Sequence, residues 1–136
     1  MKKSFALFSL ALFFASASHA GNIVVIGNDS VPKMDMATIQ KVFTGKVIKV
    51  AGVSVKAVNA QAGMPTRESF LQAFLNQNDE KYIAYWTVRR YIGKGAPPLE
   101  LQSDEDIIRY VRDNPGAVAY IDEDKLKPGM NVIARQ

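Results

Sequence analysis

The residues of this chain whose types and spacing best suit chemistry lie between positions 59 and 69. The segment leaves a β-branched run, passes through Gly63 and Pro65, and enters a pattern of apolar residues typical of a helix. A strand that leads through a polar loop into a helix N-terminus presents free backbone N–H groups and the positive end of the helix dipole. The segment therefore predicts a site for a small anion. Its candidate ligand-binding residues are Asn59, Gln61, Thr66, Arg67 and Ser69.

The composition excludes most other chemistry. The sequence contains no cysteine, and its one histidine, His19, lies near the N-terminus. The rest of the chain therefore has no thiol nucleophile, no imidazole base and no Cys/His metal site. No Gly-x-Ser-x-Gly element is present. The acidic cluster at residues 104–106 is explained by helix capping, and the cluster at 122–124 lacks the spacing of a Ca²⁺ loop. We expect a protein that is not an enzyme and that holds no metal and no cofactor.

The first twenty residues have the layout of a secretory signal peptide. A Met-Lys-Lys start precedes an apolar stretch at residues 5–14, and a small-x-small sequence ends at Ala20. The apolar stretch is too short to span a bilayer, and no second candidate follows. We expect cleavage after Ala20, a periplasmic location and no stable membrane insertion afterwards. An uncleaved N-terminal anchor is the alternative.

Charge gives no sign of a nucleic-acid partner. The formal net charge is +4, and Lys2 and Lys3, inside the predicted signal peptide, account for half of it. The other basic residues are spread along the chain, and only Arg89 and Arg90 are adjacent. This distribution is typical of a solvated surface rather than of a nucleic-acid-binding face.

Residues 21–136 read as one α/β domain in which strands and helices alternate. Asp35, Thr66, Asn78 and Ser103 are expected to cap helices, with Gly45 and Gly93 ending two of them. Residues 59–65 and 93–98 read as loops. Strands are expected at residues 22–26, 47–50, 53–58, 117–121 and 131–134, and a helical turn at 122–127. The pattern predicts a mixed, mainly parallel sheet flanked by helices.

Two features admit a functional and a structural interpretation. Tyr85 and Trp86 suit core or rim aromatic residues better than a ligand platform. The loop from Gly93 to Pro98 lacks the spacing of a phosphate-binding glycine loop, and its prolines remove amide donors. It fits a rigid or partner-contacting loop.

Three segments, in this order, resemble a known family. Ile39–Lys46 resembles the I-F-x-G-K helix end of phosphate-type periplasmic solute-binding proteins. Tyr85-Trp86 followed by Gly93–Pro98 resembles the small single-domain members of that superfamily, and Asp113–Ile121 resembles the segment N-P-G-A-I-G-Y-V that both share. The resemblance runs from about Ile23 to Ile121 and implies one lobe of the periplasmic binding protein (PBP-like) fold. It also implies a phosphate or related oxyanion ligand and an ABC permease as partner.

The resemblance is incomplete where the ligand would bind. In full-size phosphate-binding proteins the matching stretch reads approximately R-x-D-G-S-G-T, whereas here only Thr66 and Ser69 remain as hydroxyl donors. Glu68 in the first helical turn opposes an anion. In the alternative interpretation Thr66 only caps the helix, and Arg67 and Glu68 are solvated charges. The chain would then be a ligand-poor periplasmic interaction module that docks on an envelope protein such as a sensor or a porin.

Overall fold

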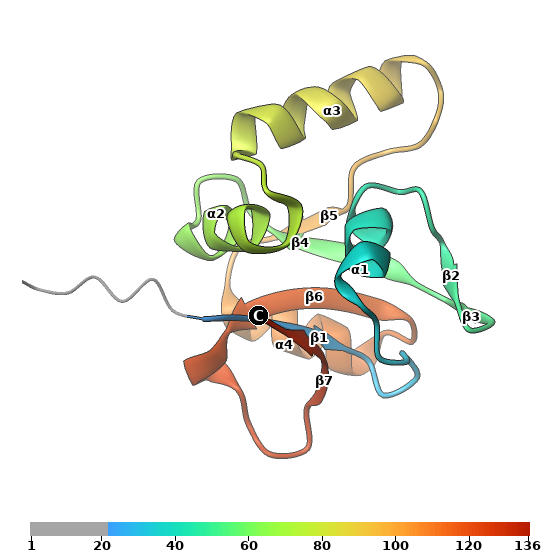
Figure 1. Ribbon diagram of the computed structural model, residues 1–136. Helices are drawn as coiled ribbons and strands as arrows, with labels where there is room; N and C mark the ends of the chain where they lie inside the picture. Colours follow the sequence, from blue (N-terminus) through green and yellow to red (C-terminus); the bar gives the residue numbers. More distant parts are fainter. Residues whose placement is uncertain (1–21) are drawn as a thin grey trace, which may run out of the picture.

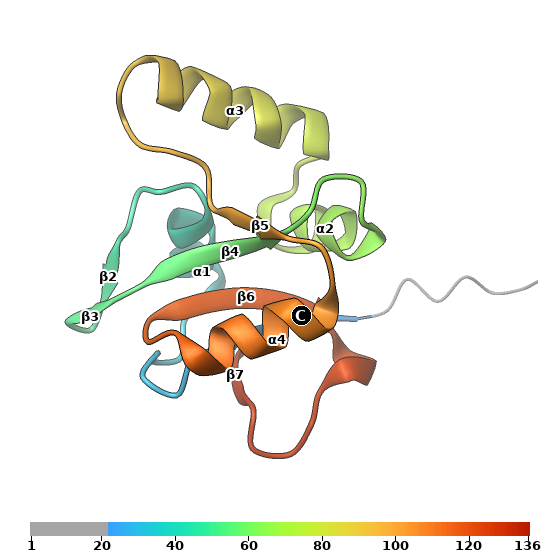
Figure 2. The same cartoon turned by 180° about the vertical axis from the view of Figure 1, so that it is seen from behind.

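The computed structural model describes residues 22–136, which form a five-stranded sheet with helices on both faces (Figures 1 and 2). The predicted signal peptide lies outside these residues. The strands are β1 (Ile23–Gly27), β2 (Lys49–Val50), β3 (Val53–Ser54), β4 (Lys56–Ala60), β5 (Leu99–Leu101), β6 (Ala117–Asp122) and β7 (Asn131–Arg135). The helices are α1 (Met36–Phe43), α2 (Pro65–Phe70), α3 (Asp79–Tyr91) and α4 (Asp104–Asp113), with a π-helical turn η1 (Leu71–Leu75) and a 3₁₀ turn η2 (Glu123–Lys125).

The sheet is mixed and mainly parallel, as the sequence predicts. Its strand order is β5-β4-β6-β1-β7. The β4–β5 and β4–β6 pairs are parallel, whereas β1 pairs antiparallel with both β6 and β7. All strands of this sheet except β1 therefore run in one direction. Helix α4 covers one face, and α1 and α2 cover the other (Figures 1 and 2).

The core lies between the sheet and these helices. All residues of β1 are buried, and so are all residues of β6 before Asp122, because both faces of these central strands are covered. On the α1–α2 side the ring of Phe70 stacks on Tyr120 at a centroid distance of 3.9 Å. Phe43 packs against both rings. This aromatic cluster fixes α1 and α2 against β6.

Local signals place three helix starts correctly. The side chains of Asp35, Asn78 and Ser103 accept hydrogen bonds from backbone N–H groups three residues further on, as N-caps do. The hydrogen bond from Thr38 holds the pKa of Asp35 below its ordinary value. Gly45, with φ of 72°, follows the end of α1. These signals need only neighbouring residues, so the sequence carries them in full.

The strand predicted over residues 53–58 is interrupted. Val53 and Ser54 pair with β2 in a small separate ribbon, and the chain joins the main sheet only from Lys56 onward. Gly116 lies against this break: a Cβ added to it would come within 2.2 Å of Ser54 O. The strand β5 was not predicted, because three residues after a proline-containing loop give too short a pattern.

No helix within residues 22–136 is long and apolar enough to cross a bilayer.

Candidate functional site

The predicted anion loop lies where β4 and β5 end. Gln61 N–H donates to Leu101 O at 2.9 Å, and Met64 N–H donates to Gln61 O at 3.1 Å. The second of these bonds closes a tight turn in which Gly63 has φ of 89°. The side chain of Gln61 is exposed at the rim of this turn. Asn59, in contrast, belongs to β4 and not to the loop, so the prediction of a loop over residues 59–65 was wrong at its start.

Helix α2 begins two residues earlier than predicted. Pro65 is its first residue and Met64 its N-cap, with no side-chain capping bond, so the prediction that Thr66 caps the helix was wrong. Proline suits the first helical position, since its φ is preset and its missing N–H is not needed there. Thr66 is instead buried, and its Oγ1 lies 3.5 Å from Asp122 Oδ2.

The carboxylates near Thr66 make this end of the sheet acidic. Burial, followed by the nearby charge of Asp122, raises the pKa of Asp104 above its ordinary value. Two acidic groups thus approach the edge that the predicted anion would occupy. Their field opposes an anion.

The backbone donors at the loop differ from those that the helix start suggested. The N–H groups of Arg67 and Glu68 both point to Met64 O, at 3.0 and 3.3 Å. Within residues 22–136 the N–H groups of Ala62, Gly63 and Thr66 have no acceptor among the hydrogen bonds of the loop and helix start. The donors without such an acceptor are therefore two groups on the exposed turn and one on the buried second residue of α2.

Arg67 is a buried structural residue, neither a solvated charge nor an open ligand contact. Its side chain is 2 % exposed, its Nε donates to Asp79 Oδ1 at 2.7 Å, and one terminal nitrogen donates to Glu100 Oε1 at 2.5 Å and to Ala60 O at 3.2 Å. Burial alone would lower the pKa of Arg67, but the hydrogen bonds to Glu100 and Asp79 raise it above its ordinary value. The guanidinium thus ties α2 to α3 and β5.

Asn59 is also buried, at 1 % exposure, and both ends of its amide are used. Its Nδ2 donates to the Tyr82 hydroxyl and its Oδ1 accepts from the Tyr120 hydroxyl, each at 3.1 Å. Tyr82 in turn donates to Phe43 O at 2.7 Å. Burial raises the pKa of both tyrosines. Asn59 therefore organises a polar network in the core, in which both ends of its amide are held by tyrosine hydroxyls.

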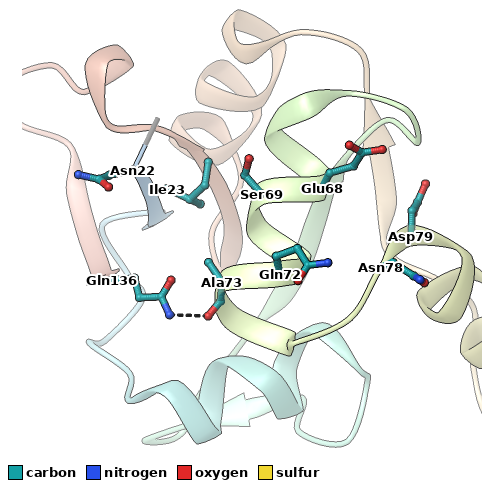
Figure 3. A pocket seen from close by; sticks show the side chains of 9 residues that line it. All are labelled: Asn22, Ile23, Glu68, Ser69, Gln72, Ala73, Asn78, Asp79 and Gln136. Carbon is teal, nitrogen blue, oxygen red and sulfur yellow. Dashed lines mark hydrogen bonds between the residues drawn. The ribbon is translucent and has the colours of Figure 1, made fainter. Parts of the chain in front are cut away.

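Ser69 lies apart from the loop, in an open groove of about 810 Å³ (Figure 3). The π-helical turn η1 contributes Gln72 and Ala73 to this groove, and Gln136 Nε2 donates to Ala73 O at 2.6 Å. The residues that line the groove are Asn22, Ile23, Glu68, Ser69, Gln72, Ala73, Asn78, Asp79 and Gln136. They include two carboxylates and no lysine or arginine, so the groove does not favour phosphate. Of the five predicted ligand residues, the structure leaves only Gln61 and Thr66 at the loop itself.

Tyr85 and Trp86 are structural, in agreement with the preferred interpretation. Trp86 is 5 % exposed and packs on Gly45, where an added Cβ would lie 2.6 Å from the indole Cη2. The Tyr85 hydroxyl donates to Thr44 O at 2.7 Å. The guanidinium of Arg89 lies over both rings at 5.6 Å. The predicted loop at residues 93–98 is present and largely exposed.

One Ser-x-x-Lys sequence, from Ser30 to Lys33, is occupied with structural contacts. Ser30 Oγ accepts a hydrogen bond from Gly116 N–H at 3.0 Å, and Lys33 Nζ donates to Val132 O on β7. The serine and the lysine therefore bind different parts of the backbone and form no nucleophile–base pair.

The fold is that of phosphate-type solute-binding proteins. The chain matches no family model and no curated protein sequence. Among solved structures it resembles an ABC-type phosphate transport receptor from Vibrio cholerae, with a TM-score of 0.63 at 15 % identity over 83 % of this chain and 45 % of that one. It also resembles a protein from Clostridium perfringens named for phosphate ABC transport and solved with bound phosphate (TM-score 0.64, 17 % identity, 83 % and 44 % covered). PstS from Borrelia burgdorferi gives a TM-score of 0.62 at 13 % identity, with 84 % and 47 % covered.

The chain spans less than half the length of these three proteins, in line with a single PBP-like lobe. At these identities the likeness establishes the fold and not the ligand. The neighbours are binding proteins and not enzymes, which fits the expectation from composition.

Proposed function

We propose that this chain is an exported, solute-binding-like protein that binds phosphate or a related small oxyanion and is associated with an ABC importer. One observation carries the proposal: a fold shared with phosphate-binding proteins presents three free N–H groups, from Ala62, Gly63 and Thr66, in the loop after β4. Consecutive backbone N–H groups in a turn form a concavity that suits an anion. The exposed Gln61 amide and the Thr66 hydroxyl border this position.

The binding is weak. A single lobe leaves the anion open to water on one side, and a half-exposed ligand gains less affinity than an enclosed one. Arg67 is held by Asp79 and Glu100 and supplies no direct contact. The charge of Glu68, exposed in the first turn of α2, opposes the anion.

Amide-resolved NMR titration with phosphate and with sulfate tests the site, with chloride at equal ionic strength as the control. We expect saturable shifts confined to residues 61–66. Glu68→Gln is expected to tighten binding a few-fold, because it removes one charge worth about 0.3–1 kcal/mol at a helix end. The absence of saturable shifts would refute oxyanion binding, and shifts confined to residues 93–98 would show that the ligand occupies a different loop.

Export is tested separately. Mass spectrometry of the periplasmic fraction should find a mature chain that begins at Gly21. Recovery of the intact precursor in the membrane fraction would contradict the proposed processing and location.

Two features favour a second function: Arg67 is held in ion pairs with Asp79 and Glu100, and the carboxylate of Asp122 lies beside Thr66. These features suit a ligand-poor interaction module that docks on an envelope protein, such as a sensor or a porin. The two functions differ in one measurable respect, since only the first predicts a saturable response of residues 61–66 to phosphate.

A further inference from the structure

Helix α3 has two apolar faces, of which the structure covers only one. Tyr82 and Trp86 lie on the inner face and are buried. Ile83, Val88 and Tyr91 lie on the outer face and are 47 %, 59 % and 92 % exposed. A helix that is apolar on both sides is normally buried on both sides. The outer face of α3 therefore lacks a partner within residues 22–136.

The outer face follows a regular helical spacing. Ile83, Ala84, Thr87, Val88 and Tyr91 recur at intervals of three and four residues, which places them along one stripe. The small side chains of Ala84 and Thr87 occupy its middle, where a second helix could approach closely. In both views α3 stands clear of the sheet, with its outer side away from the other elements (Figures 1 and 2).

Exposed charges of opposite sign lie at the two ends of the stripe. Glu80 is exposed in the first turn of α3, and Arg90 and Lys94 are exposed at its other end. Lys94 lies just beyond the helix: Gly93, with φ of 76°, ends α3, and the Lys94 N–H donates to Arg89 O at 2.8 Å as part of this C-terminal cap. Within residues 22–136 none of Glu80, Arg90 and Lys94 takes part in an ion pair.

We propose that the outer face of α3 binds a second copy of this chain, with the two α3 helices packed antiparallel about a two-fold axis near Thr87. A two-fold interface must be self-complementary. Ile83 and Tyr91 lie four residues to either side of Thr87 along the helix. Glu80 and Lys94 lie seven residues to either side in the sequence, with Lys94 just beyond the helix cap. In this register Ile83 packs against Tyr91 of the second copy, and each Glu80 faces a Lys94.

The size of the surface indicates a weak dimer. A single pair of helices of this length falls at the low end of specific interfaces, below about 1,200 Å² in total. The dimer is therefore expected to form at micromolar concentrations or above. This interface is independent of the oxyanion loop, and neither proposal requires the other.

Sedimentation equilibrium of the purified protein tests the association, over a range from about 1 µM to about 1 mM that brackets weak interfaces. The wild type should pass from monomer to dimer. Glu80→Lys should weaken the dimer about tenfold or more, because each interface contains the pair twice, and Glu80→Lys combined with Lys94→Glu should restore it. Glu105→Lys, the same charge reversal at an exposed position of α4, should have little effect on dimerisation.

A single engineered thiol tests the position of the axis. The chain has no cysteine, so Thr87→Cys introduces its only thiol. Near a two-fold axis this residue meets its own copy and should form a disulfide-linked dimer rapidly under mild oxidation. Lys81→Cys, exposed on the same helix but six residues from the proposed axis, does not meet its own copy and should cross-link slowly.

The sedimentation and cross-linking results together decide whether the proposed dimer forms. Dimerisation that responds to the charge reversal, together with fast cross-linking only at position 87, supports the proposal. A monomer throughout the range, or a dimer that is indifferent to the charge reversal and cross-links equally at both positions, would overturn it. Circular dichroism and thermal unfolding confirm that each variant is folded.

Discussion

Replacement of Arg67 by methionine should destabilise the fold rather than act mainly on ligand binding. The guanidinium is 2 % exposed and contacts Asp79, Glu100 and Ala60 O. Its loss leaves Ala60 O without this donor, which costs about 1–3 kcal/mol for a buried acceptor. Removing one partner of a fully buried ion pair costs about 3–5 kcal/mol, because the other charge is left buried and unpaired.

The exposure of the two carboxylates limits this second cost. The side chains of Asp79 and Glu100 are 20 % and 43 % exposed, so both can recover contact with water. We therefore expect Arg67→Met to lower the free energy of unfolding by about 2–4 kcal/mol. Asp79→Asn should cost more than Glu100→Gln, because the Glu100 pair is more exposed and exposed pairs contribute about 0–1 kcal/mol.

Urea denaturation followed by tryptophan fluorescence gives the measurement, since Trp86 is the only tryptophan. Arg67→Lys serves as the matched variant. One ammonium group cannot reproduce the planar fork that reaches three acceptors, so this variant should recover only part of the loss. If Arg67→Met unfolds at the wild-type midpoint but no longer binds phosphate, Arg67 is a ligand contact and the structural argument is wrong.

Three further perturbations test other parts of the fold. Trp86→Ala should cost about 3–5 kcal/mol, the usual result of emptying a large core position, as measured by chemical denaturation; an unchanged midpoint would contradict the buried role of the indole. Gly116→Ala should prevent folding or strongly lower the melting temperature, since the new Cβ would lie 2.2 Å from Ser54 O at a φ of 80°. Burial, and then the charge of Asp122, raises the pKa of Asp104, so its ionised form is less favourable in the folded than in the unfolded state. Stability contributed by this group therefore rises as pH falls through the raised pKa, and Asp104→Asn should slightly stabilise the protein at neutral pH and remove that part of the pH dependence in unfolding curves.

Elements with local signals were predictable from the sequence. The helix starts marked by Asp35, Asn78 and Ser103 depend on a side chain and a backbone N–H three residues away, and all three are confirmed. The alternation of strands and helices was likewise enough to predict the mixed, mainly parallel sheet. At Thr66 the neighbouring Pro65 decides the start of the helix instead, because proline suits the first helical position.

The environment of the candidate site was harder to predict, because it depends on contacts between distant residues. Arg67 is buried only because β5 brings Glu100, 33 positions away, beside it. Asn59 is enclosed because Tyr120, 61 positions away, reaches its amide. A polar residue next to a predicted loop gives no sign of such partners. The loop itself could be located from the sequence, but its usable donors could not.

The position of β1 between β6 and β7 also limits the order in which the protein can fold. Strand β1 pairs with β6 and β7, which lie about a hundred residues later in the sequence. Ile23 lies opposite Asp122, and Val24 lies opposite both Ile121 and Arg135. Bringing β1 together with β6 and β7 closes long segments of chain, which costs conformational entropy and slows folding. During synthesis the middle of the sheet cannot assemble until the last part of the chain has been made. A nascent chain that ends before β6 would therefore retain an unpaired apolar β1, and unpaired apolar strands are prone to aggregate.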